Sequence, residues 1–215
     1  YSTRRKHIAL LVDDEAQLIV KAPAGASEDF IKAAIARHRN WIEQKIAQIR
    51  ARDPVVRDRK FVNGENFLYL GQWYRLAIVK NQTEPLTLKD YFYLSEKYLP
   101  HAREVFIDWY KRAGLSKISE RVERYANLTG LKPERIRITR AQKRWGSCSA
   151  KGYVNFSYRL IMAPLSVIDY VVVHELVHLR IRNHSRRFWN NVKVLMPDYE
   201  KYENWLKEKG YLLKV

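Results

Sequence analysis

The eleven-residue segment HELVHLRIRNH, residues 174–184, constrains the fold of this chain more than any other stretch. It directly follows an apolar run, Tyr170–Val173, which is too short to cross a membrane but suits a helix in a protein core. Pro164 and Ser166 are typical of a helix start, so the pattern predicts a buried helix from there to about Asn183. Such a helix needs other elements packed around it, which indicates a folded domain with a substantial core.

Three histidines in this segment have the spacing of metal ligands. His174 and His178 are four residues apart, so they project from one face of the helix, one turn apart. A straight helix would carry His184 away from them, so the chain must turn first. Asn183 is the expected turning residue because asparagine tolerates a left-handed conformation. Three imidazoles at a tetrahedral metal leave one position open for water, which is the pattern of a catalytic site.

Glu175 supplies the acid–base group that such a site needs. It lies about 100° around the helix from His174, too far round to be a neighbouring ligand but close enough to take a proton from a water on the metal. A buried carboxylate is costly without a neutralising partner, and a dication is such a partner. The pattern therefore predicts one Zn²⁺ per chain. The alternative is an ordinary core helix with hydrogen-bonded histidines and no metal.

Cys148 offers a competing chemistry, in which a thiolate acts as nucleophile and a histidine as its base. Arg144 and Lys151 are close in sequence and would lower the pKa of the thiol. Against this, a single cysteine is often just a small core residue. One cysteine also excludes an internal disulfide and suits a reducing compartment, so with no leader visible at the start the chain is predicted to be cytoplasmic.

The stretch RWGSC, residues 144–148, is the expected border of the site. The small residues would leave room above a strand, so one interpretation is an edge strand that pairs with an extended substrate. The other is a tightly packed hairpin anchored by its tryptophan, and the sequence does not separate the two. The substrate-binding candidates are Trp145, Gly146, Ser147, Cys148 and Asn155. The aromatic pair Phe188 and Trp189 favours the core over a substrate platform.

Positive charge is concentrated around these motifs. The chain has a net charge of +17, and residues 135–187 hold 11 Lys and Arg against two acids, Asp169 and Glu175. Such a surface attracts anions, including nucleic acid or an acidic polypeptide. A solvated basic surface that serves solubility is the alternative. Asp169 is also, with Asp198, a candidate to orient the histidines.

Alternation and helical spacing predict a mixed chain of the α+β class. Residues 1–98 are expected to form a β-rich N-terminal region with one helix, which follows Ser27 and ends near Arg50. Residues 52–60 are expected to form a linker or loop. Residues 99–215 are expected to form the catalytic domain, with a long helix to about Leu128, strands over 135–157 and C-terminal helices after the motif.

Beyond its local patterns, the chain resembles the YgjP-like metallopeptidases, which are zincins related to the SprT and WLM (Wss1-like) groups. The similarity is carried by RWGSCSAKGYVNFSYRLIMAP, DYVVVHELVHL, NHSRRFW and MPDYEKYENWL, and it extends over nearly the whole sequence. It implies a zincin-like catalytic domain with an active-site helix, a small antiparallel sheet with an edge strand, and C-terminal helices. It also implies zinc bound by His174, His178 and His184, with Glu175 as general base.

Two functions of different classes remain open. The first is a zinc metallopeptidase that cleaves a polypeptide, with an action on nucleic-acid-associated proteins as one interpretation of the basic surface. The second is a basic nucleic-acid-binding protein whose metal site is structural or regulatory, with little or no proteolysis. Neither requires a membrane, and the sequence does not indicate the oligomeric state or the substrate.

Overall fold

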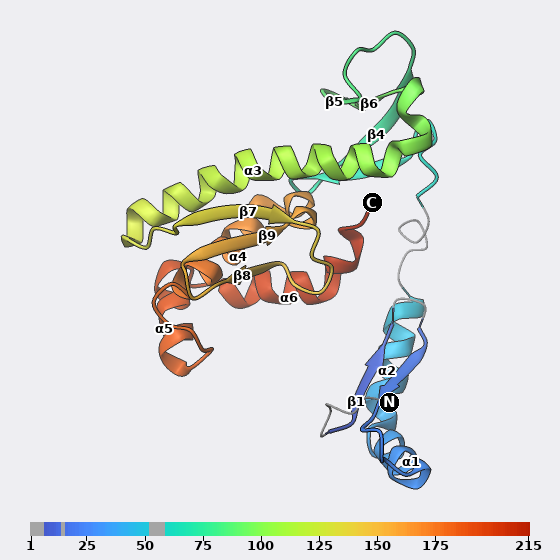
Figure 1. Cartoon of the computed structure of the whole chain (residues 1–215), viewed down its shortest axis with the longest axis vertical. Helices are drawn as coiled ribbons and strands as arrows, with labels where there is room; N and C mark the ends of the chain where they lie inside the picture. Colours follow the sequence, from blue (N-terminus) through green and yellow to red (C-terminus); the bar gives the residue numbers. More distant parts are fainter. Residues whose placement is uncertain (1–6, 14–15, 52–58) are drawn as a thin grey trace. The chain divides into compact units, whose positions relative to one another are not determined.

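A computed structural model describes residues 7–13, 16–51 and 59–215 and confirms the α+β class, with small sheets and several helices (Figure 1). Contacts group the chain into two compact units, Tyr1–Val55 and Val56–Val215. The functional division expected near residue 98 stays a prediction, and most of the expected linker, 52–58, lies outside the described residues. In the described ranges, no helix has the length and apolar character needed to span a bilayer.

The N-terminal unit combines a hairpin with two helices. Strands β1 (Ala9–Val12) and β2 (Leu18–Lys21) pair antiparallel. The single helix expected here is wrong, because the backbone leaves helical geometry at His38 and gives α1 (Glu28–Arg37) and α2 (Arg39–Arg50). The hydroxyl of Ser27 accepts a hydrogen bond from the Phe30 amide and caps the first helix, as its position predicts. Among the described residues of this unit, the buried hydrophobic side chains are Ala22, Ile42 and Ile49.

The second unit begins with a four-stranded sheet in the order β3-β4-β6-β5. Its strands are β3 (Asn66–Tyr69), β4 (Gln72–Val79), β5 (Leu86–Leu88) and β6 (Phe92–Ser95). Leu70 and Gly71 turn β3 into β4 with positive φ, and a Cβ on Gly71 would lie 2.9 Å from the Cα of Pro164. A short 3₁₀ helix, η2 (Glu96–His101), leads into the long helix α3 (Ala102–Thr129).

The sheet that borders the motif is mixed, so the expectation of an antiparallel sheet is wrong in one of its two pairings. β8 (Gly146–Cys148) pairs antiparallel with β9 (Tyr153–Ser157), but β7 (Arg135–Thr139) pairs parallel with β9. The strand order is β7-β9-β8, because the hairpin places its second strand, β9, between β7 and β8. β8 is therefore an edge strand, as one interpretation of RWGSC predicts.

The remaining elements surround the motif helix. The 3₁₀ helix η3 (Tyr158–Met162) precedes α4 (Leu165–Val177), which carries the motif, and α5 (Arg186–Leu195), α6 (Tyr199–Lys209) and η4 (Gly210–Leu212) follow. Within this unit, α3 runs along the β7-β9-β8 sheet and contacts α4 (Figure 1).

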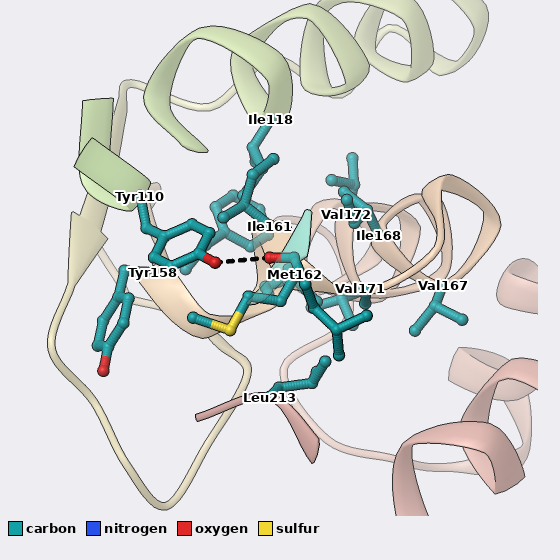
Figure 2. Close-up of a cluster of buried hydrophobic side chains, with 14 of the residues drawn as sticks. Tyr110, Ile118, Tyr158, Ile161, Met162, Val167, Ile168, Val171, Val172 and Leu213 are labelled. Carbon is teal, nitrogen blue, oxygen red and sulfur yellow. Dashed lines mark hydrogen bonds between the residues drawn. The ribbon is translucent and has the colours of Figure 1, made fainter. Parts of the chain in front are cut away.

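The core of the second unit holds α4 in place. Figure 2 shows side chains of α3, η3 and α4 meeting there, among them Ile118, Ile161 and Val172, which are fully buried. Tyr110 of α3 is buried beside them and donates its hydroxyl to the carbonyl oxygen of Leu68 at 2.7 Å. The burial of residues 171–173 and 176–177 explains why the motif needs such apolar flanks: they fix the helix that positions the polar groups.

Candidate metal centre

Three imidazoles meet where α4 ends. His174 lies in the last turn of the helix, His178 is its C-cap residue, and His184 returns from the segment that follows. The Nε2 atom of His184 lies 3.0 Å from Nε2 of His174 and 3.1 Å from Nε2 of His178. Nitrogens about 2.0–2.1 Å from one tetrahedral ion are separated by about 3.3–3.4 Å, which is close to this spacing. The three side chains thus fit a single metal ion.

The turn before His184 differs from the expected one. Helix α4 ends at Val177, and the amides of Arg180 and Ile181 both donate to the Val177 carbonyl oxygen, at 3.0 and 2.9 Å. Asn183 does not adopt a left-handed conformation, so its predicted role as the turning residue is wrong. The tight turn over 178–181 changes the chain direction instead, and the buried side chain of Ile181 anchors it.

Burial keeps the two helix histidines neutral, which is the state that binds metal. Burial, followed by the neighbouring His178 and His184, lowers the pKa of His174 to about 3. Burial also lowers the pKa of His178. The Nδ1 atom of His178 lies 3.0 Å from the carbonyl oxygen of Ile181, so the Nδ1–H tautomer leaves Nε2 as the free ligand atom.

Glu175 is buried against the edge strand. Its side chain has an oxygen, Oε2, that is buried without a hydrogen-bond partner in the described part of the chain. Burial raises the pKa of this carboxyl to about 8, and Arg144 opposes that shift. A Cβ added to Gly146 would lie 2.5 Å from Oε1 of Glu175, so only glycine allows β8 to approach this closely. A bound cation would satisfy an unpartnered buried carboxylate, and Glu175 lines the same cavity as His174.

The substrate-binding candidates have different surroundings. Ser147 and Asn155 are opposite residues of β8 and β9, and the Asn155 amide donates weakly to the Ser147 hydroxyl at 3.4 Å. Trp145 packs against Gly210, and the guanidinium carbon of Arg159 lies 4.5 Å from the centre of the tryptophan ring. This packing is what the packed-hairpin interpretation predicts. Both interpretations of RWGSC are thus partly correct: the strand is a free edge and its tryptophan is an anchor.

A cavity of about 340 Å³ lies beside Glu175. It is lined mainly by Trp145 and Gly146 from the edge strand region, by α4, and by Glu203, Leu206 and Lys207 of α6. Because His174 and Glu175 also line it, the candidate site opens into a space large enough for part of a substrate.

Cys148 does not have the environment of an activated thiol. Burial raises its pKa, and the cation close to it is Arg182 at 3.7 Å, not the expected Arg144 or Lys151. The expectation of a lowered pKa is therefore wrong, and the nucleophile interpretation loses its physical basis.

Two further features support the site, and only one of them was predictable from the sequence. Asp169 does not orient a histidine in this structure: its oxygens accept two hydrogen bonds from Arg121 of α3, at 2.6 and 2.7 Å, in a buried pair. Phe188 of α5 is fully buried and packs against all three imidazoles, with ring centres 4.5–4.9 Å apart, which confirms its predicted core position. Arg121 lies 48 residues before Asp169, so its partner could not be recognised from local spacing.

The fold and the site together place three histidines that could hold a metal ion at the end of a buried helix. The chain belongs to the YgjP-like family: residues 6–209 match its metallopeptidase domain, which confirms the predicted family. The family is one of metal-dependent peptidases that act on polypeptides. No curated protein has significant sequence similarity to the chain.

One solved structure with weak similarity is that of the metallopeptidase zymogen of Pyrococcus abyssi abylysin. It is 19% identical in sequence, and the alignment covers 43% of this chain and 95% of that one with a TM-score of 0.40. This similarity is too low to support a common fold.

Proposed function

We propose that the chain is a zinc-dependent peptidase in which His174, His178 and His184 hold one Zn²⁺ and Glu175 is the general base. The observation that carries the proposal is the convergence of three Nε2 atoms, with the buried, unpartnered carboxylate of Glu175 one residue from His174 and lining the same cavity. Three imidazole nitrogens suit zinc, and a set of three leaves a position open for water or substrate. A zincin-like catalytic domain over residues 99–215 is part of the same proposal.

When bound, zinc would acidify a coordinated water and polarise the carbonyl of the scissile peptide bond. The protein then supplies the proton transfers. Glu175 takes a proton from the attacking water and passes it to the leaving amine. Its raised pKa in the metal-free protein shows how strongly burial disfavours the carboxylate, and a neighbouring dication favours that charged form.

The edge strand β8 orients the substrate. Its free edge offers backbone N–H and C=O groups with which an extended polypeptide pairs, and Gly146 brings that edge against Glu175. Ser147, Cys148 and Asn155 border the same region, and Trp145 lines the cavity beside the base.

Substitution of the base tests this mechanism. Glu175→Gln keeps the shape of the side chain but removes the proton acceptor, so cleavage of an unfolded protein such as casein should fall by about 1,000-fold. Elemental analysis should still find about one zinc per chain in the variant. If the purified variant retains wild-type cleavage with zinc bound, Glu175 is not the base.

A second candidate function, nucleic-acid binding, is favoured by uncompensated charge in the second unit. Arg135, Arg137, Lys151, Arg186 and Arg187 are exposed, and their side chains form no ion pair in the described part of the chain. The Glu134 amide donates to the Gly152 carbonyl oxygen, so the start of β7 and the β8–β9 turn are neighbours, and their cations share one region. Phosphate backbones bind such surfaces.

This candidate makes its own prediction. Affinity for single- or double-stranded DNA should fall steeply with salt, and Arg135→Glu with Arg137→Glu should reduce it by about 10-fold or more. The peptidase proposal stands if DNA stimulates cleavage or has no effect on it. Tight DNA binding with no cleavage of any protein by zinc-loaded wild type would favour the binding function alone. A cytoplasmic location remains a prediction that fits either function.

A further inference from the structure

The segment that carries His184 has unusually little backbone support. Helix α4 and its turn end at Ile181, and α5 begins at Arg186. Within the described part of the chain, Arg182, Asn183 and His184 make no backbone hydrogen bond. All three residues are also exposed. A candidate ligand on such a segment can hold its position only if side chains fix the segment.

Arg182 is the side chain that ties this segment to the neighbouring β8–β9 hairpin. Its Nη1 donates to the carbonyl oxygen of Ser149 at 2.6 Å, and its Nη2 donates to the carbonyl oxygen of Ala150 at 3.2 Å. Nη1 also lies 3.7 Å from the sulfur of Cys148. The guanidinium thus bridges the end of the edge strand β8 and a position two residues before His184. Charge-assisted hydrogen bonds of this forked kind are among the stronger ones in proteins.

The acceptor side of this bridge is rigid. Ser149 and Gly152 close a tight turn: the Gly152 amide donates to the Ser149 carbonyl oxygen at 3.0 Å, and the Tyr153 amide donates to the Ser149 hydroxyl at 3.1 Å. Gly152 supplies the positive φ that the turn needs. The movable partner is therefore the segment with His184, which the turn holds through Arg182.

The two ends of β8 contact two different parts of the site. Gly146 at the start of the strand packs against Glu175, and the turn after Cys148 is bound by Arg182. The strand is thus fixed to the helix-borne base at one end and to the segment of the third histidine at the other. Loss of either contact would change the distance between the strand and the imidazoles.

We propose that Arg182 is a positioning residue that bridges the β8–β9 turn and the His184 segment. It thereby sets the place of the third ligand and the spacing between the metal centre and the strand that orients the substrate. The inference deepens the proposed function and rests on it for the substrate part. The part that concerns His184 needs only metal binding.

A lysine variant distinguishes the hydrogen-bonded bridge from an effect of positive charge alone. Arg182→Lys keeps the positive charge but cannot donate to two carbonyl oxygens from a planar fork. We expect Arg182→Lys and Arg182→Gln to raise the zinc dissociation constant by about 10-fold or more, measured by competition with a chelator. Arg112→Lys and Arg112→Gln, at an exposed position of α3, are the matched controls and should leave it unchanged.

Two further measurements separate the role of Arg182 from an effect on folding and extend the test to the substrate. Hydrogen exchange of the Gly152 and Tyr153 amides should stay slow in the Arg182 variants, while the amides of residues 182–184 should exchange faster than in wild type. With a cleavable long peptide, KM should rise about 10-fold in both variants and more than for a short peptide. A wild-type zinc affinity and exchange pattern in Arg182→Lys would overturn the proposal.

A variant that loses zinc affinity only in proportion to its unfolded fraction would also overturn it, since the role would then be merely structural. If wild type cleaves nothing, the proposed function fails. The zinc and exchange measurements still decide the role of Arg182 in that case.

Discussion

The two halves of the candidate metal centre are built in different ways. His174 and His178 stand on α4, whose flanking residues are fully or nearly fully buried, so the core fixes them. His184 stands on an exposed segment without helix or sheet, held by the bridge from Arg182 and by packing on Phe188. The difference teaches that one site can combine a rigid pair of ligands with a third that depends on side-chain contacts.

The largest predicted effect is on metal affinity. His174→Ala leaves one helix ligand and the segment ligand, whereas His184→Ala leaves the preorganised pair. We expect His174→Ala to weaken zinc binding by about 1,000-fold. His184→Ala should weaken it by only about 100-fold. Chelator competition on both variants measures the difference. Equal losses would contradict the distinction between a rigid pair and a tethered third ligand.

A second prediction concerns the buried ion pair of Arg121 and Asp169, which joins α3 to the helix that carries His174 and His178. Asp169→Ala leaves Arg121 buried without its partner, and breaking such a pair costs about 3–5 kcal/mol. Denaturant unfolding should show this loss of the free energy of unfolding. The folded fraction should still bind zinc with near wild-type affinity, because the pair contacts no histidine. Glu123→Ala, which removes an exposed acid of α3 that forms no ion pair among the described residues, is the control for lost charge.

A third prediction concerns the contact between the edge strand and the base. Gly146→Ala forces a Cβ to within 2.5 Å of Glu175, so strand or base must shift. Stability should fall by about 1–3 kcal/mol and cleavage should fall more than zinc affinity does. Gly114→Ala is the matched control. Its Cβ meets nothing closer than 3.7 Å, and in the middle of α3 it should raise stability by about 0.5–1 kcal/mol.

The last prediction is a pH dependence of the metal-free protein. Burial raises the pKa of Glu175 from 4.5 to about 8, so the neutral carboxyl stabilises the fold below about pH 4.5. That stability is lost as the pH rises through about 8. Glu175→Gln stays neutral, so its Tm advantage over wild type should grow between pH 5 and pH 8. A constant difference across this range would show that the carboxyl is not buried as described.

Local spacing made the helix half of the site predictable. The i, i+4 histidines, the buried Glu175 and the glycine of the edge strand follow from residue type and position alone. The sequence could not predict the turn that returns His184, because it is made by backbone hydrogen bonds to Val177 and by Arg182, and not by a turn-forming residue at position 183. Long-range partners such as Arg121 and Asp169 likewise depend on how α3 packs against α4.

The direction of the strands was the other feature that the sequence could not fully predict. The hairpin of β8 and β9 was predictable from its small turn residues, but the parallel pairing of β7 with β9 depends on a connection that crosses past the hairpin. The break at His38 between α1 and α2 also has no proline or glycine to mark it in the sequence.

X-ray absorption at the zinc edge, recorded on the zinc-loaded chain, tests the central claim most directly. We predict three imidazole nitrogens and one oxygen ligand at about 2.0–2.1 Å, with the number of imidazoles falling to two in His184→Ala. A sulfur scatterer at about 2.3 Å would instead point to Cys148. That result, or fewer than three imidazoles in wild type, would contradict the site described here.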